Sequence, residues 1–142
     1  RHEAFAEDAF KFMERTPSNS PVKGENKKSP FKGDIEGPGY DLIILDPPAF
    51  AKHKDALHNA LRGYTKLNAK AFEKIQPGGI LFTFSCSQAV NKDQFRTAVF
   101  TAAAMAKRKV RILHQLHQPA DHPINIYHPE GEYLKGLVLY VE

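Results

Sequence analysis

Long apolar runs and cysteine are what this sequence has least of. No stretch approaches the roughly 18 to 20 apolar residues of a membrane-spanning helix, so no transmembrane segment is predicted. The single cysteine, Cys86, excludes an internal disulfide framework and favours a reducing compartment, which we expect to be the cytoplasm. Charge of one sign is also scarce, because 20 Lys and Arg face 16 Asp and Glu. That mild excess permits an anionic partner such as nucleic acid without requiring one.

What remains is the composition of an ordinary globular protein. Hydrophobic residues make up 42% and charged residues 25%, which excludes a disordered charged tail and a collagen-like repeat. A chain of 142 residues is long enough for one domain with a real core. It opens with Arg1 and shows no Met, signal core or transit segment there, so we expect a piece of a longer protein.

The first 39 residues divide into two parts. Residues 2–6 are compatible with a short strand, and residues 8–15 have helical spacing with Asp8 as a candidate N-cap. Residues 16–39 hold four of the ten prolines and four of the nine glycines, together with several lysines. This composition predicts an exposed, flexible loop.

From residue 40 onward, strand and helix patterns alternate. The expected elements are a strand at 40–45, a helix at 55–75 ended by Gln76-Pro77-Gly78-Gly79, a strand at 80–84, a helix at 91–109, and strands at 110–116 and 134–141. This order predicts an α/β fold with a parallel sheet, in which the apolar strand 40–45 is buried on both faces. The last two strands lack a helix between them, so we expect them to pair antiparallel at the sheet edge.

The helix at 91–109 carries clear end signals. Asn91 is a candidate N-cap, and Gln94 stands at the capping-box position three residues later. Lysines and an arginine at 107–109 suit the C-terminal end of the helix dipole. Helical spacing predicts an inward face formed by Phe95, Val99, Ala102 and Met105.

The first candidate site is Asp46-Pro47-Pro48-Ala49-Phe50, which follows the strand at 40–45. Ligands of open α/β sheets bind beyond the carboxyl ends of the strands, and Asp46 stands at such an end. The two prolines hold the backbone, and Phe50 offers a stacking face for a base. The alternative is a rigid strand exit with a solvated Asp46 and a core Phe50.

The second candidate is Ser85-Cys86-Ser87, at the end of the next strand. Small hydroxyl neighbours leave the thiol accessible and offer hydrogen bonds, which suits a nucleophilic Cys86. The alternative is a buried cysteine that acts as a small apolar residue, which is its commonest state.

Histidines and basic residues give weaker signals. His114 and His117 face opposite sides of a strand, so they cannot share a metal ion, and we expect no metal site. Lys52, Arg62 and Tyr64 combine basic and aromatic side chains as RNA-binding surfaces do, but a solvated helix face explains them equally well.

Six motifs in order carry a resemblance to a known family. They are Asp46-Pro47-Pro48-Ala49-Phe50-Ala51-Lys52, Arg62-Gly63-Tyr64, Pro77-Gly78-Gly79, Phe82-Thr83-Phe84-Ser85-Cys86-Ser87, Asp121-His122-Pro123 and Pro129-Glu130-Gly131-Glu132-Tyr133-Leu134-Lys135-Gly136. Together they resemble the large-subunit ribosomal RNA cytosine-5 methyltransferases, class I enzymes that use S-adenosylmethionine (SAM). The resemblance implies the C-terminal portion of a Rossmann-like methyltransferase sheet with a reversed last strand.

The same resemblance implies roles for single residues. Cys86 matches the catalytic nucleophile, and Asp46 matches a catalytic carboxylate that contacts the target cytosine. The implied cofactor-binding residues are Asp8, Ala9, Phe10, Asp46 and Pro47, with Asp8 on the adenine amine of SAM. The implied contacts to the ribosomal RNA are Pro48, Phe50, Lys52, Arg62 and Tyr64.

Two features depart from the family. The Gly-rich SAM loop and the N-terminal RNA-binding domain are absent from the sequence, so we expect a partial methyltransferase domain with an incomplete SAM site and no activity by itself. The strand at 41–45 would lack its usual neighbour, and an open strand edge favours self-association. Two alternatives stay open: methylation of an exocyclic amine on adenine or guanine, and a non-catalytic RNA-binding module.

Overall fold

The structure is a computed structural model that describes residues 39–51 and 54–142. The helix predicted at 8–15 and almost all of the loop predicted at 16–39 lie outside these ranges. The described elements, in chain order, are β1 (Tyr40–Leu45), the 3-10 helix η1 (Lys54–Ala56), α2 (Leu57–Lys74), β2 (Ile75–Ser85), α3 (Lys92–Met105), β3 (Val110–Leu116), the 3-10 helix η2 (Pro129–Gly131) and β4 (Lys135–Val141). The predicted α/β alternation is confirmed.

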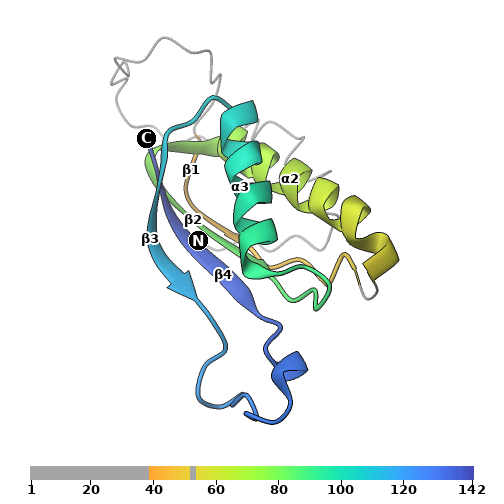
Figure 1. Ribbon diagram of the computed structural model, residues 1–142. Helices are drawn as coiled ribbons and strands as arrows, with labels where there is room; N and C mark the ends of the chain where they lie inside the picture. Colours follow the sequence, from red (N-terminus) through yellow and green to blue (C-terminus); the bar gives the residue numbers. More distant parts are fainter. Residues whose placement is uncertain (1–38, 52–53) are drawn as a thin grey trace, which may run out of the picture.

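The strands form one mixed sheet in the order β1-β2-β4-β3 (Figure 1). β1 pairs parallel with β2, whereas β4 pairs antiparallel with both of its neighbours, β2 and β3. The predicted antiparallel pairing of the last two strands is therefore confirmed, with β4 inserted between β2 and β3. Because β1, β2 and β3 run in one direction, their carboxyl ends meet at the same edge of the sheet.

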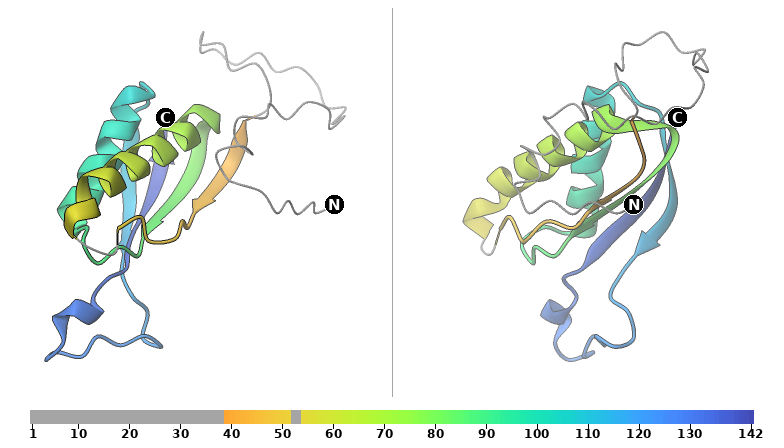
Figure 2. Two further views of the ribbon diagram at one scale, coloured as in Figure 1. Left: turned by 90° about the vertical axis from the view of Figure 1, so that its right-hand side faces the viewer. Right: turned by 180° about the vertical axis from the view of Figure 1, so that it is seen from behind.

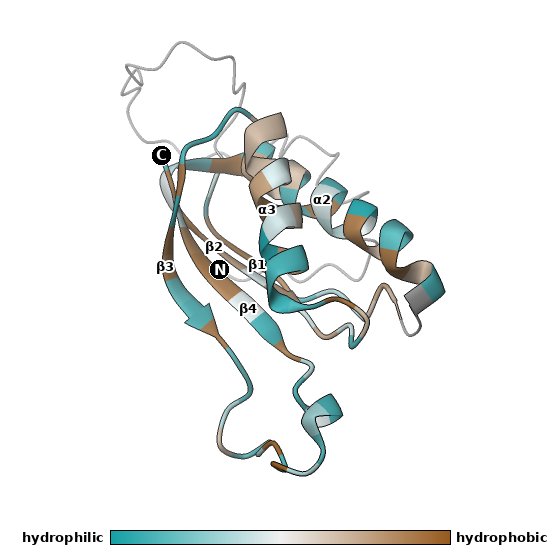
Figure 3. Cartoon of the chain, in the orientation of Figure 1, coloured by the Kyte–Doolittle hydropathy of each residue, from teal (hydrophilic) through white to brown (hydrophobic). Residues whose placement is uncertain are grey.

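Both long helices cover one face of the sheet (Figure 2). The core between the layers combines strand residues such as Leu81, Leu139 and Val141 with Phe72 of α2, all almost completely buried. Apolar colour follows β2 and β4 in Figure 3, whereas α2 alternates along its length. Within the described residues, no helix is both long enough and apolar enough to cross a membrane.

β2 differs from the expected strand in where it begins. We predicted a break at residues 76–79 and a strand from Ile80, but β2 already begins at Ile75. In the pairing of β1 with β2, Tyr40 lies opposite Ile75 and Leu42 lies opposite Ile80. The residues of β2 between Ile75 and Ile80 therefore form a bulge. Gly78, inside this bulge, takes a φ of 86°, a conformation that glycine adopts without strain.

α3 begins as predicted and ends earlier. The Gln94 amide donates to Asn91 Oδ1 at 2.8 Å and the Asn91 amide to Gln94 Oε1 at 3.0 Å, which confirms the capping box. The helix ends at Met105 rather than 109, because Lys107 takes a φ of 54° and the Arg108 amide then donates back to the Ala103 carbonyl. The inward orientation predicted for Met105 is wrong: near this helix end its side chain is 62% exposed.

β1 differs from prediction in its burial. Leu42 and Ile44 are 54% and 62% exposed, so the expectation of burial on both faces is wrong for this strand. The physical reason is that the described helices cover only the face to which Ile43 and Leu45 point. β1 stands at the end of the described sheet, and its self-association stays a prediction.

Candidate functional site

Adjacent parallel strands bring the two predicted chemical segments together. β1 ends at Leu45 and is followed by Asp46, while β2 ends at Ser85 and is followed by Cys86. Leu45 pairs with Thr83, so both chains leave the sheet side by side. The Cys86 sulfur lies 3.9 Å from the Pro47 carbonyl oxygen, which is within reach of a weak S–H···O hydrogen bond. Asp46 is exposed, and Pro47 and Cys86 are half-buried.

The segment after β1 is held by its proline rings and by an aromatic contact. Pro47 and Pro48 restrict φ and remove two backbone N–H groups. The Phe50 ring then packs on Tyr64 of α2 with 4.6 Å between ring centroids. Gly63 makes room for this contact, because a Cβ at that position would lie 3.0 Å from the Phe50 ring.

The segment after β2 is held by hydrogen bonds to Ser87. Its hydroxyl lies 2.9 Å from the Tyr64 hydroxyl, and the Ala51 amide donates to it at 3.3 Å. The Lys135 ammonium of β4 donates to the Ser87 carbonyl at 2.6 Å. We call these four residues the Ser87 cluster. It joins α2, β4 and both strand exits directly behind Cys86.

The electrostatics of the site are set by a buried cation. Lys135 is only 6% exposed, and this burial lowers the pKa of its ammonium group. Negative charge on Cys86 acts in the opposite direction, and the neighbouring charge of Lys92 adds to the lowering. Lys92 itself is paired with Glu132, whose pKa is lowered by that hydrogen bond and charge.

The predicted site residues fall into three groups. Asp46, Pro47, Pro48, Phe50 and Cys86 gather at the carboxyl edge of β1 and β2. Asp8, Ala9, Phe10 and Lys52 lie outside the described residues. Tyr64 is completely buried and packs edge-on against Phe95, so direct contact with RNA does not fit its position. Its place is beneath the site, as a support for Phe50 and Ser87.

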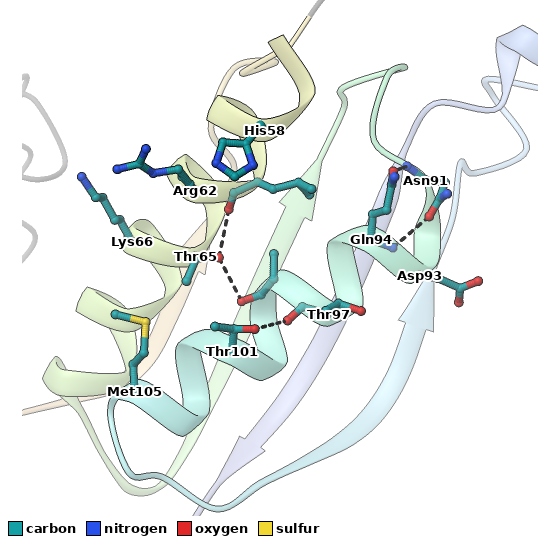
Figure 4. A pocket seen from close by; sticks show the side chains of 12 residues that line it. His58, Arg62, Thr65, Lys66, Asn91, Asp93, Gln94, Thr97, Thr101 and Met105 are labelled. Atoms are coloured by element: carbon teal, nitrogen blue, oxygen red, sulfur yellow. Dashed lines mark hydrogen bonds between the residues drawn. The ribbon is translucent and has the colours of Figure 1, made fainter. Parts of the chain in front are cut away.

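Arg62 lies on the outer surface of α2, where it belongs to a basic ridge. His58, Arg62 and Lys66 follow one another at intervals of four residues and are all exposed. They flank a groove of about 610 Å³ between α2 and α3, whose far wall includes Thr97 (Figure 4). The groove runs along both helices, from His58 and Asn91 near their starts to Met105 at the end of α3.

Three residues at this edge have contacts or positions that the sequence did not predict. Ser87 and Lys135 are buried and hydrogen-bonded to each other, and only their spatial neighbours show their importance. The sequence signal for Lys135 is a single cation at the start of an apolar strand. Tyr127 is 86% exposed in the loop between β3 and β4, which leaves the sheet at the same edge (Figure 1). Within the described ranges, no three His, Cys, Asp or Glu side chains cluster as metal ligands would.

Comparisons with known proteins identify several relatives of this chain. No protein-family model matches the chain. Over 106 residues it is 50% identical to Ribosomal RNA large subunit methyltransferase I of Shewanella denitrificans, a match that covers 75% of this chain and 27% of that protein. The protein of the same name from Cronobacter sakazakii is 44% identical over 106 residues, with the same coverage. The chain thus spans about a quarter of the length of these relatives.

Solved structures agree at the level of the fold. SMU.776, a protein classed as a methyltransferase and solved in complex with SAH, superposes with a TM-score of 0.59 and 25% identity over 72% of this chain and 26% of its own. A SAM-dependent methyltransferase from Streptococcus mutans gives a TM-score of 0.57 at 22% identity, over 72% of this chain and 25% of its own. The chain is therefore homologous to a segment of ribosomal RNA large subunit methyltransferase I, and that segment has a SAM-dependent methyltransferase fold.

Proposed function

We propose that this chain forms part of an enzyme that transfers a methyl group from SAM to carbon 5 of a cytosine in large-subunit ribosomal RNA. The observation that carries the proposal is the meeting of Cys86 with the Asp46-Pro47-Pro48 segment, 3.9 Å from sulfur to carbonyl oxygen. The names of the relatives support ribosomal RNA as substrate, and the SAH complex of SMU.776 supports SAM as cofactor.

The oxygen atoms at the carboxyl edge of the strands suit a cationic cofactor. The Asp46 carboxylate is exposed, and Pro47 and Pro48 present carbonyl oxygens but no N–H groups. Asp46 and Pro47 would therefore hold the positively charged part of SAM, and Asp8, Ala9 and Phe10 its adenosine. When bound, SAM supplies an electrophilic methyl group on a sulfonium centre.

Cys86 would activate the cytosine, because carbon 5 of an aromatic ring is a poor nucleophile. Its thiolate adds to carbon 6, which forms an S–C bond and breaks the aromaticity of the ring. The electron pair released toward carbon 5 makes that atom enamine-like and able to accept the methyl group. A base then removes the carbon 5 proton, the C–S bond breaks, and the thiolate is restored.

Asp46 would stabilise the charge that addition creates. Attack at carbon 6 pushes negative charge toward the ring nitrogen N3 and the carbonyl oxygen. The Asp46 carboxyl group would meet this charge through a proton or hydrogen bond at N3, and the prolines that follow hold it in place. Its exposed position on the site edge leaves it accessible to a base that has been turned out of its stack.

The RNA would extend from this edge over two described surfaces. The ridge of His58, Arg62 and Lys66 presents positive charge to phosphate groups, which bind in a salt-dependent way. Tyr127 on the β3–β4 loop offers an exposed ring on which a base can stack. Phe50 is half-buried, and the exposed part of its ring would offer a second stacking surface nearer to Cys86.

The decisive test uses the full-length protein with SAM and RNA that carries 5-fluorocytosine. Fluorine at carbon 5 cannot leave as a proton, so a cysteine nucleophile stays bonded to the RNA. We expect a covalent adduct that mass spectrometry maps to Cys86, and none with Cys86→Ser. Methyl transfer to ordinary RNA without any adduct would contradict the proposal.

A second candidate is methylation of an exocyclic amine on adenine or guanine. The Asp46-Pro47-Pro48 segment at a strand end favours it, because amine methyltransferases use an Asp/Asn-Pro-Pro-aromatic motif that needs no cysteine. Here the aromatic residue, Phe50, comes one position late, which counts against it. Cys86→Ser separates the two reactions, since it should abolish transfer to carbon 5 and leave amine transfer nearly intact. A full-length protein that binds RNA but not SAM would instead indicate a non-catalytic module.

A further inference from the structure

Lys135 is an unusual residue for its position. It begins β4 with 6% of its surface exposed, whereas lysines are rarely buried without a charged partner. Among the described residues, no carboxylate lies within 4.0 Å of its ammonium group. Its ammonium group donates a hydrogen bond to a neutral acceptor, the Ser87 carbonyl. Such a group costs stability, so its position calls for a reason.

The geometry directs this charge at the segment that carries the thiol. Lys135 stands opposite Ser85 in the antiparallel pairing of β4 with β2. From there its side chain reaches past Ser85 to the Ser87 carbonyl at 2.6 Å, spanning the backbone that bears Cys86. Cys86 is also the group whose charge favours the protonated form of Lys135.

We propose that Lys135 is a positioning residue for Cys86, which anchors the backbone of residues 85–87 and places a fixed positive charge beside the Cys86 thiolate. The inference rests on the proposed function, in which that thiolate is the nucleophile. Two effects follow. The anchor holds the thiol at the edge next to Pro47, and the charge stabilises the sulfur while it acts as an anionic nucleophile. Reciprocally, a thiolate offsets the cost of burying the ammonium group.

The neighbouring cation Lys92 is less suited to this role than Lys135. Lys92 is the other cation that acts on the group, but it is exposed and paired with Glu132. Its charge is therefore largely balanced, and solvent screens what remains. A buried charge is screened far less, so the charge of Lys135 persists at ordinary salt concentrations.

The test measures thiol reactivity and needs neither SAM nor RNA. Because Cys86 is the single cysteine, the rate at which iodoacetamide alkylates the chain at pH 7 reports on one sulfur. We expect Lys135→Met to slow alkylation about threefold to tenfold, from the loss of one nearby charge. Lys135→Arg, which keeps the charge, should stay within about twofold of the parent. The matched control Lys92→Met makes the same change in net charge at an exposed position, where solvent screens it, and should leave the rate unchanged.

Lys135→Gln separates charge from anchor, because its amide can still donate to the Ser87 carbonyl. If Lys135→Gln is alkylated as slowly as Lys135→Met, the charge effect is supported. If it is alkylated at the rate of the parent, the charge effect is overturned. Each rate is compared with that of the same variant unfolded in urea, so a variant that fails to fold is recognised by equal rates in both conditions. Equal slowing by Lys92→Met would also overturn the proposal.

A second readout connects the residue to methyl transfer in the full-length protein. We expect Lys135→Gln to lower kcat at least tenfold with little change in KM for RNA, since the residue lies behind the sulfur and does not reach the surface. If 5-fluorocytosine RNA gives no adduct even with the parent, the proposed function fails. If the adduct forms and Lys135→Gln retains the parental alkylation rate and kcat, this inference alone fails.

Discussion

The two strand exits that form the site are held in different ways. After β1, the chain passes through Pro47 and Pro48, and the Asp46 carboxylate is exposed. After β2, Ser87 is completely buried and joined to Ala51, Tyr64 and Lys135. One exit is stiffened by covalent ring geometry, which acts locally. The other is stiffened by hydrogen bonds to residues distant in the sequence.

This difference predicts that the two exits respond differently to substitution. A local restraint does not depend on the packing around it, so changes after β1 should alter chemistry and leave the fold intact. A hydrogen-bonded restraint shares its partners with the core, so changes after β2 should alter stability and chemistry together. The exit after β1 is therefore suited to present a charge, and the exit after β2 to hold a thiol at a fixed place.

The largest effect is expected from Asp46→Asn in the full-length protein. The amide can donate a hydrogen bond, but it has neither a proton to transfer to N3 of the cytosine nor a negative charge, so methyl transfer should fall about 10²- to 10⁴-fold. Because Asp46 is exposed, the free energy of unfolding should change by no more than about 0.5 kcal/mol. Radiolabelled methyl transfer and urea unfolding measure the two quantities. Asp55, also exposed, serves as control: Asp55→Asn should leave transfer unchanged.

Ser87→Ala should affect both stability and reactivity. It leaves the buried Tyr64 hydroxyl and the Ala51 amide without an acceptor, which should lower the free energy of unfolding by about 1–3 kcal/mol. The alkylation rate of Cys86 should change as well, because its neighbour no longer anchors the segment. Urea unfolding and iodoacetamide kinetics measure the two effects.

A double-mutant cycle with Tyr64→Phe sharpens this prediction. When both hydroxyls are absent, no buried donor is left on the tyrosine, so the double variant should be less destabilised than the sum of the single variants. The expected coupling is about 0.5–1.5 kcal/mol. Simple additivity would show that the 2.9 Å contact between the hydroxyls contributes nothing to stability.

Pro48→Ala should have a smaller effect on stability. The ring restricts the unfolded chain, so its removal costs about 0.4–1 kcal/mol by entropy alone. If the ring also positions Asp46, methyl transfer should fall further than in Pro119→Ala, which removes an exposed proline from the β3–β4 loop. Equal activity of the two variants would show that the covalent restraint after β1 is not needed for positioning.

The same contrast explains what the sequence could and could not predict. Asp46, Pro47 and Cys86 were found because each stands directly after an apolar run, and strand order then brings them together. Asn91 was found because a capping box is local. The contact between Ser87 and Lys135 was missed because it joins residues 48 positions apart. Tyr64 was assigned to the surface because helical spacing does not show that the Ser87 hydroxyl lies within its reach.

Burial of Lys135 should have the smallest effect on the free energy of unfolding, and the direction of that effect with pH is definite. Its pKa is lowered by burial, so near the upper end of the pH range the unfolded chain holds a proton that the folded chain has released. The free energy of unfolding should therefore rise with pH from the lowered pKa to the ordinary lysine value, and Lys135→Met should lose this slope.

Glu132 should give a second dependence of the free energy of unfolding on pH, this time in the acidic range. The hydrogen bond and charge of Lys92 lower the pKa of the Glu132 carboxyl group. The contribution of Glu132 to stability is therefore present at neutral pH and disappears as pH falls through the lowered pKa. Because Glu132 and Lys92 are on the surface, added salt should weaken this acidic slope, and the alkaline slope of the buried Lys135 should persist. Urea unfolding across pH at low and high salt distinguishes the two. An alkaline slope that disappears in salt would mean that the charge of Lys135 is exposed to solvent, and a solvent-screened ammonium could not act on the Cys86 sulfur as a buried one does.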